Sequence, residues 1–324
     1  DFDTPWHIRD EGIYSLEKGR TFYTSNAGLK ELKIEISKYL DRKYGMKYNY
    51  NNEIMVTVGG SEGIDMALRA MLDPGDEVII PQPSYVSYEP CTVLAGGKPV
   101  IVELKEENEF RLTAEELEEA ITPKSKILIM PFPNNPTGAV MELNDIEAIA
   151  KVVKEHDLYV ITDEIYSELT YLEKHVSIAS LAPDLFCVTF SGLSKSHMIA
   201  GFRVGWMVLS GNKAMAKDYI LGLNMLSNMR LCSNVPAQSI VQTALGGHQS
   251  VQNYIVPGGR IYEQREYIYK ALNDIPGITA VKPKAAFYIF PKVDTKKFNI
   301  VDDEKFALDL LRDKKILIIH GGGF

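Results

Sequence analysis

The chain has 324 residues, and its 35 basic and 43 acidic side chains give a net charge of -8. At about 150 residues per domain, this length predicts two domains. The acidic balance excludes the basic footprint of proteins that bind nucleic acid or anionic membrane surfaces, so we expect small-molecule partners. Three widely spaced cysteines without CxxC or histidine neighbours predict neither a disulfide framework nor a metal site, and they are typical of a reducing cytoplasm.

The two ends carry no targeting pattern. No apolar run reaches the roughly 18 residues that span a bilayer, and no charged segment followed by an apolar one opens the chain, so we expect a cytoplasmic protein. The chain begins at Asp1 without an initiator Met. Its last segment, Lys315–Phe324, has the pattern of a strand and turn with nothing after it, so we expect residues to be missing at both ends.

Seven short apolar runs, rich in β-branched residues, predict buried strands. They are Ile54–Val58, Val78–Ile80, Val100–Leu104, Lys126–Met130, Leu158–Thr162, Phe186–Phe190 and Gly205–Leu209. Helical patterns such as Ser61–Met71 and Leu143–His156 lie between them. Because strand and helix alternate, we expect an α/β fold with a mostly parallel, seven-stranded sheet sandwiched by helices.

The pattern changes from about Ala214 onward. Longer helical segments such as Gly259–Asn273 are followed by the strand-like run Phe287–Phe290, which predicts a smaller α+β domain. No low-complexity linker separates the two parts, so we expect them to pack together. The predicted boundaries are 23–262 for the large domain and 1–22 plus 263–324 for the small domain.

Gly59–Gly63 opens the helix that follows the first predicted strand. A helix N-terminus has free N–H groups and a positive dipole end, so it is a natural seat for a phosphate. Gly60, Ser61 and Glu62 are the candidate contacts. Ser61 can also act as an N-cap, and the two roles use the same geometry.

Two further polar segments follow predicted strands. Pro133–Gly138, with Asn135 at its centre, comes after Lys126–Met130, and on its own Asn-Pro-Thr-Gly is an ordinary turn. Asp163 closes the strand Leu158–Thr162 at its carboxyl end, where parallel sheets form ligand crevices. An N-cap for the next helix is the alternative reading of Asp163.

Lys195 lies among small residues after another buried strand, in the segment Ser191–Trp206. Such a Lys is accessible to a ligand, and a neutral Lys amine can form a Schiff base with a carbonyl compound. Taken alone, a Ser-Lys pair at the end of a strand is more often a surface Lys. The context of the segment therefore decides its interpretation.

The segment resembles the active-site signature of class I and II aminotransferases, S-x-x-S-K followed by G-x-R-x-G, which depend on pyridoxal 5'-phosphate. The match includes Ser194, Lys195, Arg203 and Gly205, but Gly192 stands where the family often has Ser. The resemblance implies the fold of fold type I transferases. It also implies that Lys195 binds the cofactor as a Schiff base, that Arg203 holds its phosphate, and that Ser194 or Ser191 contributes a hydrogen bond to that phosphate.

The same resemblance assigns roles to the other segments. Asn135 and Tyr166 are implied to hydrogen-bond the phenolic oxygen of the cofactor, and Asp163 to pair with its protonated pyridine nitrogen. Lys195, Asp163 and Tyr166 form the implied catalytic set. Tyr85 corresponds to the aromatic ring that stacks on the cofactor.

Two further family features concern residues outside this set: one serves a neighbouring subunit, and the other is expected beyond the end of the chain. Tyr23 corresponds to a Tyr that reaches the phosphate of the neighbouring subunit, which implies a homodimer with shared active sites. The family's Arg for the substrate α-carboxylate is expected beyond Phe324. A bidentate Arg of this kind orients the substrate for reaction.

The resemblance is closest to the bacterial glutamate-pyruvate (alanine) aminotransferases, through phrases such as Gly201–Leu209, Met229–Gln238 and Pro257–Arg260. We therefore expect transamination between L-alanine or L-glutamate and a 2-oxo acid. Asp163–Tyr171 also resembles aromatic aminotransferases, so aromatic, aspartate or N-acyl-diaminopimelate substrates stay open. A β C-S lyase on the same scaffold and an aminotransferase-like ligand sensor are the remaining alternatives.

Overall fold

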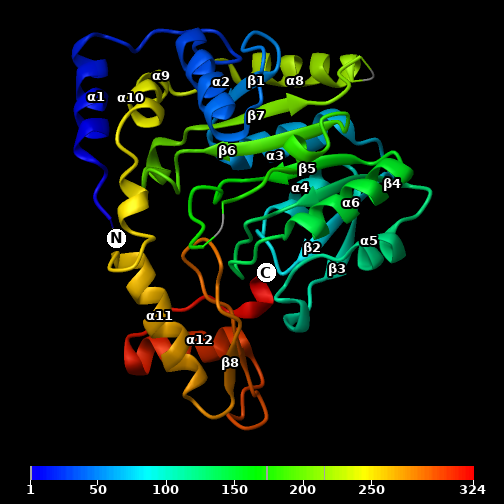
Figure 1. Cartoon of the computed structure of the whole chain (residues 1–324), viewed down its shortest axis with the longest axis vertical. Coiled ribbons are helices and arrows are strands. Elements are labelled where there is room, and N and C mark those ends of the chain that lie inside the picture. Colours follow the sequence, from blue (N-terminus) through cyan, green and yellow to red (C-terminus); the bar gives the residue numbers. More distant parts are fainter. Residues whose placement is uncertain (1, 173, 215) are drawn as a thin grey trace.

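The computed structural model describes residues 2–172, 174–214 and 216–324, and all seven predicted strands form one sheet in it (Figure 1). Their order across the sheet is β1-β7-β6-β5-β4-β2-β3. The strands are β1 Ile54–Thr57, β2 Glu77–Gln82, β3 Lys98–Glu103, β4 Ser125–Met130, β5 Tyr159–Asp163, β6 Cys187–Gly192 and β7 Gly205–Ser210.

The sheet is mostly parallel, as the alternation of strands and helices predicts. Only β7 runs against its neighbours, because it pairs antiparallel with both β1 and β6. The pairs β2–β3, β2–β4, β4–β5 and β5–β6 are parallel. The carboxyl ends of β4, β5 and β6 therefore meet at one edge, with β5 in the middle of the sheet.

Helices cover both faces of the sheet (Figure 1). In β5, Ile161 belongs to a core with α3 and α8, whereas its neighbour Val160 belongs to a core with α6 on the other face. Successive side chains of a strand point to opposite faces, so strands buried on both sides are apolar throughout. The predicted α/β sandwich is thus confirmed.

The helical segments have the following bounds. The α-helices are α1 Trp6–Glu17, α2 Lys30–Tyr44, α3 Gly59–Met71, α4 Tyr88–Leu94, α5 Ala114–Ala120, α6 Leu143–Glu155, α7 Ile178–Leu181, α8 Lys217–Arg230, α9 Val235–Ser239, α10 Val241–Gly246, α11 Arg260–Asn273 and α12 Asp303–Lys314. Short 3-10 turns lie at Glu106–Asn108, Ala200–Phe202, Ser250–Asn253 and Gly321–Gly323. None of the helices in the described ranges is long and apolar enough to cross a membrane.

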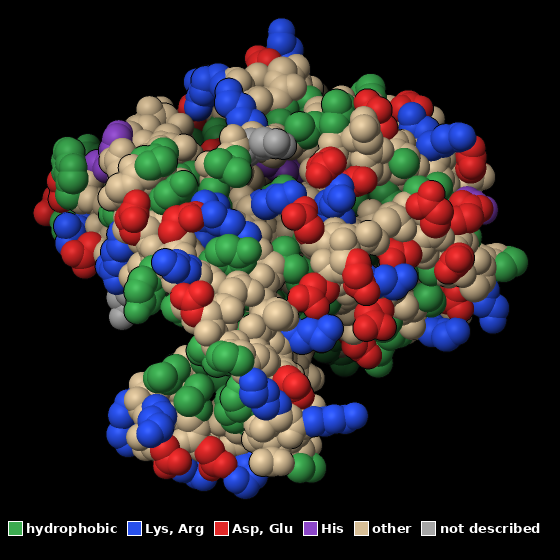
Figure 2. Space-filling view, turned by 60° about the horizontal axis from the view of Figure 1, so that its bottom comes forward, with side chains coloured by type: hydrophobic (Ala, Val, Ile, Leu, Met, Phe, Trp, Pro, Cys, Tyr) green, Lys and Arg blue, Asp and Glu red, His purple; other side chains and the backbone are tan. Residues whose placement is uncertain are grey.

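A smaller lobe contains α11, α12 and a two-stranded antiparallel sheet of β8 (Ile278–Ala280) and β9 (Pro291–Val293). Figure 2 shows this lobe standing apart from the larger body, with basic and acidic side chains mixed over both. Helix α1 packs on α9 and α10 of the larger body. The boundaries 23–262, 1–22 and 263–324 stay a prediction.

Two strand predictions for the C-terminal part are wrong. Phe287–Phe290 is irregular, because Ala286 has a positive φ of 59° and the preceding Ala285 forms an isolated bridge with Thr170. Residues 316–320 of the segment Lys315–Phe324 form neither a helix nor a strand. A strand needs a neighbour for its backbone hydrogen bonds, and no segment in the described ranges pairs with these residues.

The chain between α11 and β9 is tied back to the larger body by its backbone. The amides of Lys284 and Ala285 both donate to the Gly138 carbonyl, at 3.0 and 2.9 Å, and Ala286 donates to Leu169 at 2.8 Å. Gly138 has a φ of +70°, and a Cβ there would lie 2.7 Å from the Ala285 carbonyl oxygen. Glycine is therefore required for this close approach.

We expect Gly138→Ala to destabilise the protein more than a glycine replacement of equal backbone strain. Gly45, the C-cap of α2, is the matched control, because its φ is +67° and a Cβ there would meet nothing within 4 Å. Gly45→Ala should lose about 1–2 kcal/mol of unfolding free energy from the left-handed backbone. Gly138→Ala should lose roughly 1–3 kcal/mol more, from overpacking against Pro283 and Ala285. Urea unfolding measures the unfolding free energy of both variants. Equal losses in the two would contradict the close contact between Gly138 and Ala285.

Candidate active site

A cavity of about 180 Å³ opens at the carboxyl edge of the sheet. Nine of the eleven residues singled out from the sequence line it, although they come from five separate stretches of the chain. These nine are Gly60, Ser61, Tyr85, Asn135, Asp163, Tyr166, Ser194, Lys195 and Arg203. The fold therefore brings the predicted motifs together at one place.

The start of α3 and the start of β7 touch at one end of this cavity. A Cβ on Gly205 would lie 2.9 Å from the Gly60 nitrogen, and a Cβ on Gly59 would lie 2.5 Å from the Arg203 guanidinium. Side chains at these glycines would fill the space that the cation and the helix N-terminus share. The Ser61 hydroxyl lies beside them, 3.1 Å from the hydroxyl of Tyr85.

Arg203 reaches this end of the cavity from a left-handed backbone position, with a φ of 54°. One Nη donates to the Ala200 carbonyl at 3.1 Å. Within the described part of the chain, no carboxylate lies within ion-pair distance of Arg203. An unneutralised guanidinium at the N-terminus of a 13-residue helix forms a seat for an anion such as a phosphate.

Asp163 lies at the other end of the cavity, at the last position of the central strand β5. The Tyr88 hydroxyl donates to one carboxylate oxygen at 2.9 Å, and the Ile165 amide donates to the other at 3.2 Å. Burial raises the pKa of the Asp163 carboxyl above its ordinary value, although these two donors and Lys195 act in the opposite direction. A cationic group in the cavity would reverse this effect.

Tyr88 is a site residue that the sequence reasoning missed. Its side chain is 2 % exposed, at the first position of α4, and its ring packs against Tyr85 with centroids 5.6 Å apart. Burial, followed by the neighbouring Asp163, raises its pKa well above the ordinary value, so the phenol stays protonated and donates. Its three-residue spacing from Tyr85 is the only signal in the sequence.

Lys195 lies in the loop between β6 and β7, three residues after β6 ends. Ser196 and His197 anchor this loop, because both are buried and the His197 Nε2 lies 3.0 Å from the Ala244 carbonyl. The Lys195 Nζ lies 5.8 Å from the ring centroids of Tyr166 and Phe287. The Lys195 side chain therefore lines the cavity next to two aromatic rings, in a loop that its buried neighbours anchor.

Tyr166 packs deeply beside Lys195, with 3 % of its surface exposed. Its hydroxyl oxygen lies 2.6 Å from that of Tyr288, which comes from the segment between β8 and β9. Burial raises the pKa of Tyr166, which keeps its phenol protonated. Tyr288 is the second residue that the sequence reasoning missed, because it lies in the run expected to be a strand.

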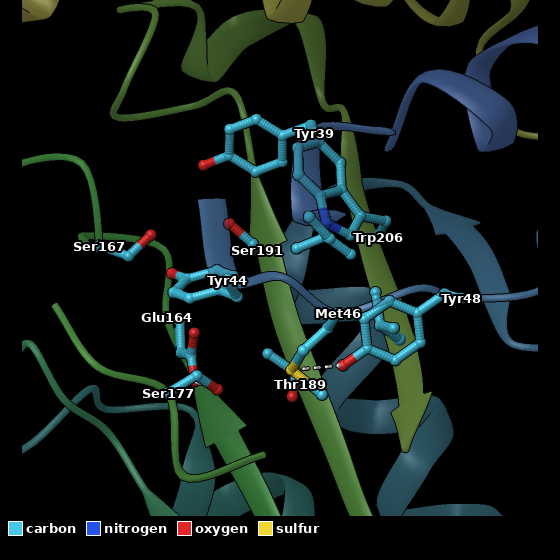
Figure 3. A pocket seen from close by; sticks show the side chains of 12 residues that line it. Tyr39, Tyr44, Met46, Tyr48, Glu164, Ser167, Ser177, Thr189, Ser191 and Trp206 are labelled. Carbon is cyan, nitrogen blue, oxygen red and sulfur yellow. Dashed lines mark hydrogen bonds between the residues drawn. The ribbon is translucent and has the colours of Figure 1, made fainter. Parts of the chain in front are cut away.

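The segment that carries Asp163 and Tyr166 is held in place by contacts of Glu164 outside the large cavity. Its intervening residue Glu164 lines a second, smaller cavity, where Figure 3 shows its carboxylate beside Ser177 and Tyr44. The Ser177 hydroxyl donates to Glu164 at 2.6 Å, and the His175 Nε2 lies 3.1 Å from it. Together with Lys43, these two groups hold the pKa of Glu164 low against its burial, so the carboxylate stays ionised.

Two predicted residues do not line the cavity. The Glu62 carboxylate accepts from the Val58 amide at 2.7 Å and pairs with Arg230 at 3.2 Å, so only its backbone is left for an anion. The Tyr23 side chain is 81 % exposed, away from the cavity of its own chain. Contact of Tyr23 with a neighbouring subunit stays a prediction.

The residues that line the cavity fit the cofactor that the resemblance implies. A phosphate matches the anion seat of Ser61 and Arg203, and a protonated ring nitrogen supplies the cation that Asp163 lacks. Asn135 and Tyr166 provide hydrogen-bond donors between these ends, and Tyr85 provides an aromatic face. The Lys195 amine lies on the same cavity.

The raised pKa of Asp163 makes a prediction for the cofactor-free protein. The folded state binds this proton more tightly than the unfolded chain, so stability present below the ordinary pKa of 3.8 is lost as the pH rises through the raised pKa. We expect Asp163→Asn to raise the Tm of the cofactor-free protein at pH 7, and this gain to shrink toward pH 4.

The matched control is Asp184→Asn, at an exposed carboxylate paired with Lys154. Lys154 lowers the pKa of Asp184, so Asp184→Asn should lower the Tm at pH 7 instead of raising it. This change in Tm should be small, because the Asp184 carboxylate is exposed to solvent. Thermal unfolding followed by circular dichroism from pH 4 to pH 8 measures both variants. A Tm of Asp163→Asn at or below that of the wild type at pH 7 would overturn this account of the site.

Comparison with known proteins agrees with the geometry. The chain is 45 % identical over 324 residues to glutamate-pyruvate aminotransferase AlaA of Haemophilus influenzae, covering all of this chain and 80 % of that protein. The crystal structure of an aminotransferase from Escherichia coli superposes with a TM-score of 0.96 at 42 % identity, covering 99 % of this chain and 80 % of that one.

An alanine aminotransferase from Pyrococcus furiosus superposes with a TM-score of 0.93 at 34 % identity, covering all of this chain and 81 % of that one. The sequence model of aminotransferase class I and II matches residues 1–324. The expected fold type I architecture is therefore confirmed. The match spans every motif that lines the cavity, so the chain belongs to the class I and II aminotransferases and is an enzyme of that family.

Proposed function

We propose that this protein catalyses pyridoxal-phosphate-dependent transamination between L-alanine or L-glutamate and a 2-oxo acid. The observation that carries the proposal is the single cavity shared by Lys195, Asp163, Asn135 and Arg203. An amine, a buried carboxylate, an amide and a guanidinium are the groups that the chemistry requires, and they come from three separate segments of the chain.

The residues divide between holding the cofactor and tuning it. Arg203 and Ser61, with the backbone at the start of α3, bind the phosphate. Tyr85 stacks on the ring. Asn135 and Tyr166 donate hydrogen bonds to its phenolic oxygen, while Asp163 keeps the ring nitrogen protonated. When bound, the cofactor supplies an electron sink for the charge that develops at the substrate Cα.

Lys195 has two tasks in this proposal. Its amine would hold the cofactor covalently, and once the substrate amine takes that place the Lys195 amine would be free beside the substrate Cα. In the second task Lys195 is the general base, taking the proton from Cα and delivering it to C4' of the cofactor. The buried Ser196 and His197 limit the movement of the loop, so the amine travels by rotation of its own side chain.

The choice of alanine rests on the named relatives, a glutamate-pyruvate aminotransferase and an alanine aminotransferase, which match the whole chain. The phrases around Gly201–Leu209 and Met229–Gln238 support the same subgroup. Aromatic, aspartate or N-acyl-diaminopimelate substrates and β C-S lyase activity are the competing outcomes of the assay below. We place the enzyme in the cytoplasm, because Cys91, Cys187 and Cys232 are free thiols.

A homodimer is part of the proposal. Helix α8 exposes Leu221, Met225 and Met229, which are four residues apart and therefore lie on one face, with Met229 81 % exposed. Tyr23 is equally exposed. An apolar stripe of this kind suits burial against a second copy of the chain, and Tyr23 then reaches the phosphate seat of that copy.

An absorbance experiment tests the reaction. The purified protein with pyridoxal 5'-phosphate should gain a visible band, which L-alanine converts to the pyridoxamine form and 2-oxoglutarate restores. Lys195→Ala should lower turnover by about 10⁴-fold or more, because the base is lost. Conversion by an aromatic amino acid alone would refute the choice of alanine, and ammonia release without an oxo acid would favour the lyase. Absence of a band would refute the proposal.

Subunit mixing tests the shared site. In a hybrid of Lys195→Ala with Tyr23→Ala, one site carries both defects and the other carries neither. Random mixing makes about half of the dimers hybrids, so activity should rise to roughly a quarter of the wild-type value. If Tyr23 serves its own subunit, mixing will restore nothing above the sum of the separate variants. Analytical ultracentrifugation establishes the dimer first.

A further inference from the structure

Tyr288, from the segment between β8 and β9, contacts the proposed catalytic set through Tyr166. Its hydroxyl oxygen lies 2.6 Å from that of Tyr166, and the two rings meet edge to face with centroids 5.6 Å apart. Tyr288 itself does not line the cavity. Its contact with the site is the one it makes with Tyr166.

The direction of this hydrogen bond follows from counting protons. A phenol has one proton to donate and two lone pairs that accept. In the proposed function Tyr166 gives its proton to the phenolic oxygen of the cofactor, so the bond to Tyr288 can form only if Tyr288 is the donor. The geometry allows either phenol to be the donor. The proposed reaction allows only the arrangement in which Tyr288 donates to Tyr166.

We propose that Tyr288 is a positioning residue, whose hydroxyl donates to Tyr166 and thereby aims the Tyr166 proton at the phenolic oxygen of the cofactor. The inference rests on the proposed function and deepens it. Donation into a phenol oxygen also makes that phenol a stronger donor, because hydrogen bonds in a chain polarise one another.

The surroundings hold Tyr288 in place for this task. The Ala286 amide donates to the Leu169 carbonyl at 2.8 Å, and the Tyr171 hydroxyl donates to the Ala286 carbonyl. Phe287 packs edge to face on Tyr166, with ring centroids 5.7 Å apart. Since Leu169 and Tyr171 follow Tyr166 in the same loop, donor and acceptor are fixed to one local scaffold.

A measurable consequence concerns the acidity of the bound cofactor. When the unit of cofactor and Lys195 loses its proton, negative charge gathers on the phenolic oxygen, and a donor to that oxygen favours the deprotonated form. Loss of the Tyr288 hydroxyl weakens the hydrogen bond that Tyr166 donates to this oxygen. The pH at which the bound cofactor changes its absorbance should therefore rise.

The experiment is a pH titration of the bound cofactor's absorbance in the wild type, Tyr166→Phe, Tyr288→Phe and the double variant. Tyr288→Phe should raise the midpoint by roughly half a pH unit and lower kcat/KM by about 3- to 10-fold, the range of one neutral hydrogen bond. Tyr166→Phe should raise it further. Adding Tyr288→Phe to Tyr166→Phe should then change nothing, because Tyr288 acts only through Tyr166.

Tyr171→Phe is the matched control. It removes a hydroxyl that holds the same segment through Ala286, but it leaves both partners of the Tyr166–Tyr288 bond intact. The midpoint should stay at the wild-type value. An equal shift in Tyr171→Phe and Tyr288→Phe would overturn the proposal, since placement of the segment would then explain the effect. Additive shifts in the double variant would also overturn it.

A second readout uses the protein without cofactor. Because the two hydroxyls bond each other, the loss of Tm in Tyr166→Phe added to that in Tyr288→Phe should exceed the loss in the double variant; strictly additive losses would contradict the bond. The titration separates the two hypotheses. If the wild type gains no cofactor band, the proposed function is refuted. If the band forms but its pH midpoint is the same in Tyr288→Phe as in the wild type, only the role of Tyr288 is refuted.

Discussion

The position of the Asp163 carboxylate is the constraint on which the site depends. It ends β5, the middle strand of seven, so protein surrounds it on both sides of the sheet. Burial disfavours its charge, and the donors Tyr88 and Ile165 only partly offset this. The fold thus maintains a carboxylate in a place where it lowers stability, as expected where a bound cation completes the site.

The segment that follows β5 places its side chains in two different cavities. Asp163 and Tyr166 face the large cavity, whereas Glu164 faces the small cavity behind it and holds Ser177 and His175 there. The partners of Glu164 outweigh its burial, whereas those of Asp163 do not, so the two adjacent carboxylates have opposite pKa shifts. One carboxylate fixes the loop, and the other is left for a ligand.

The sequence predicts the sheet and the motifs well, because both depend on local signals. Strands buried on both faces are apolar throughout, and Gly59 and Gly138 mark close approaches that no other residue permits. Tyr88 and Tyr288 could not be found in this way, since a phenol acquires its role only from the partner that the fold places beside it. The same contacts explain why Phe287–Phe290, apolar enough for a strand, is irregular.

The segment that contains Tyr288 belongs functionally to the larger body. Its backbone donates three hydrogen bonds to Gly138 and Leu169, and they place it beside two of the family motifs, Pro133–Gly138 and Asp163–Tyr166. Gly138 therefore serves two ends at once: it closes the turn that presents Asn135, and it docks the chain that presents Tyr288. A change at this glycine should disturb both groups that meet at the phenolic oxygen, which links the packing of the two lobes directly to the chemistry.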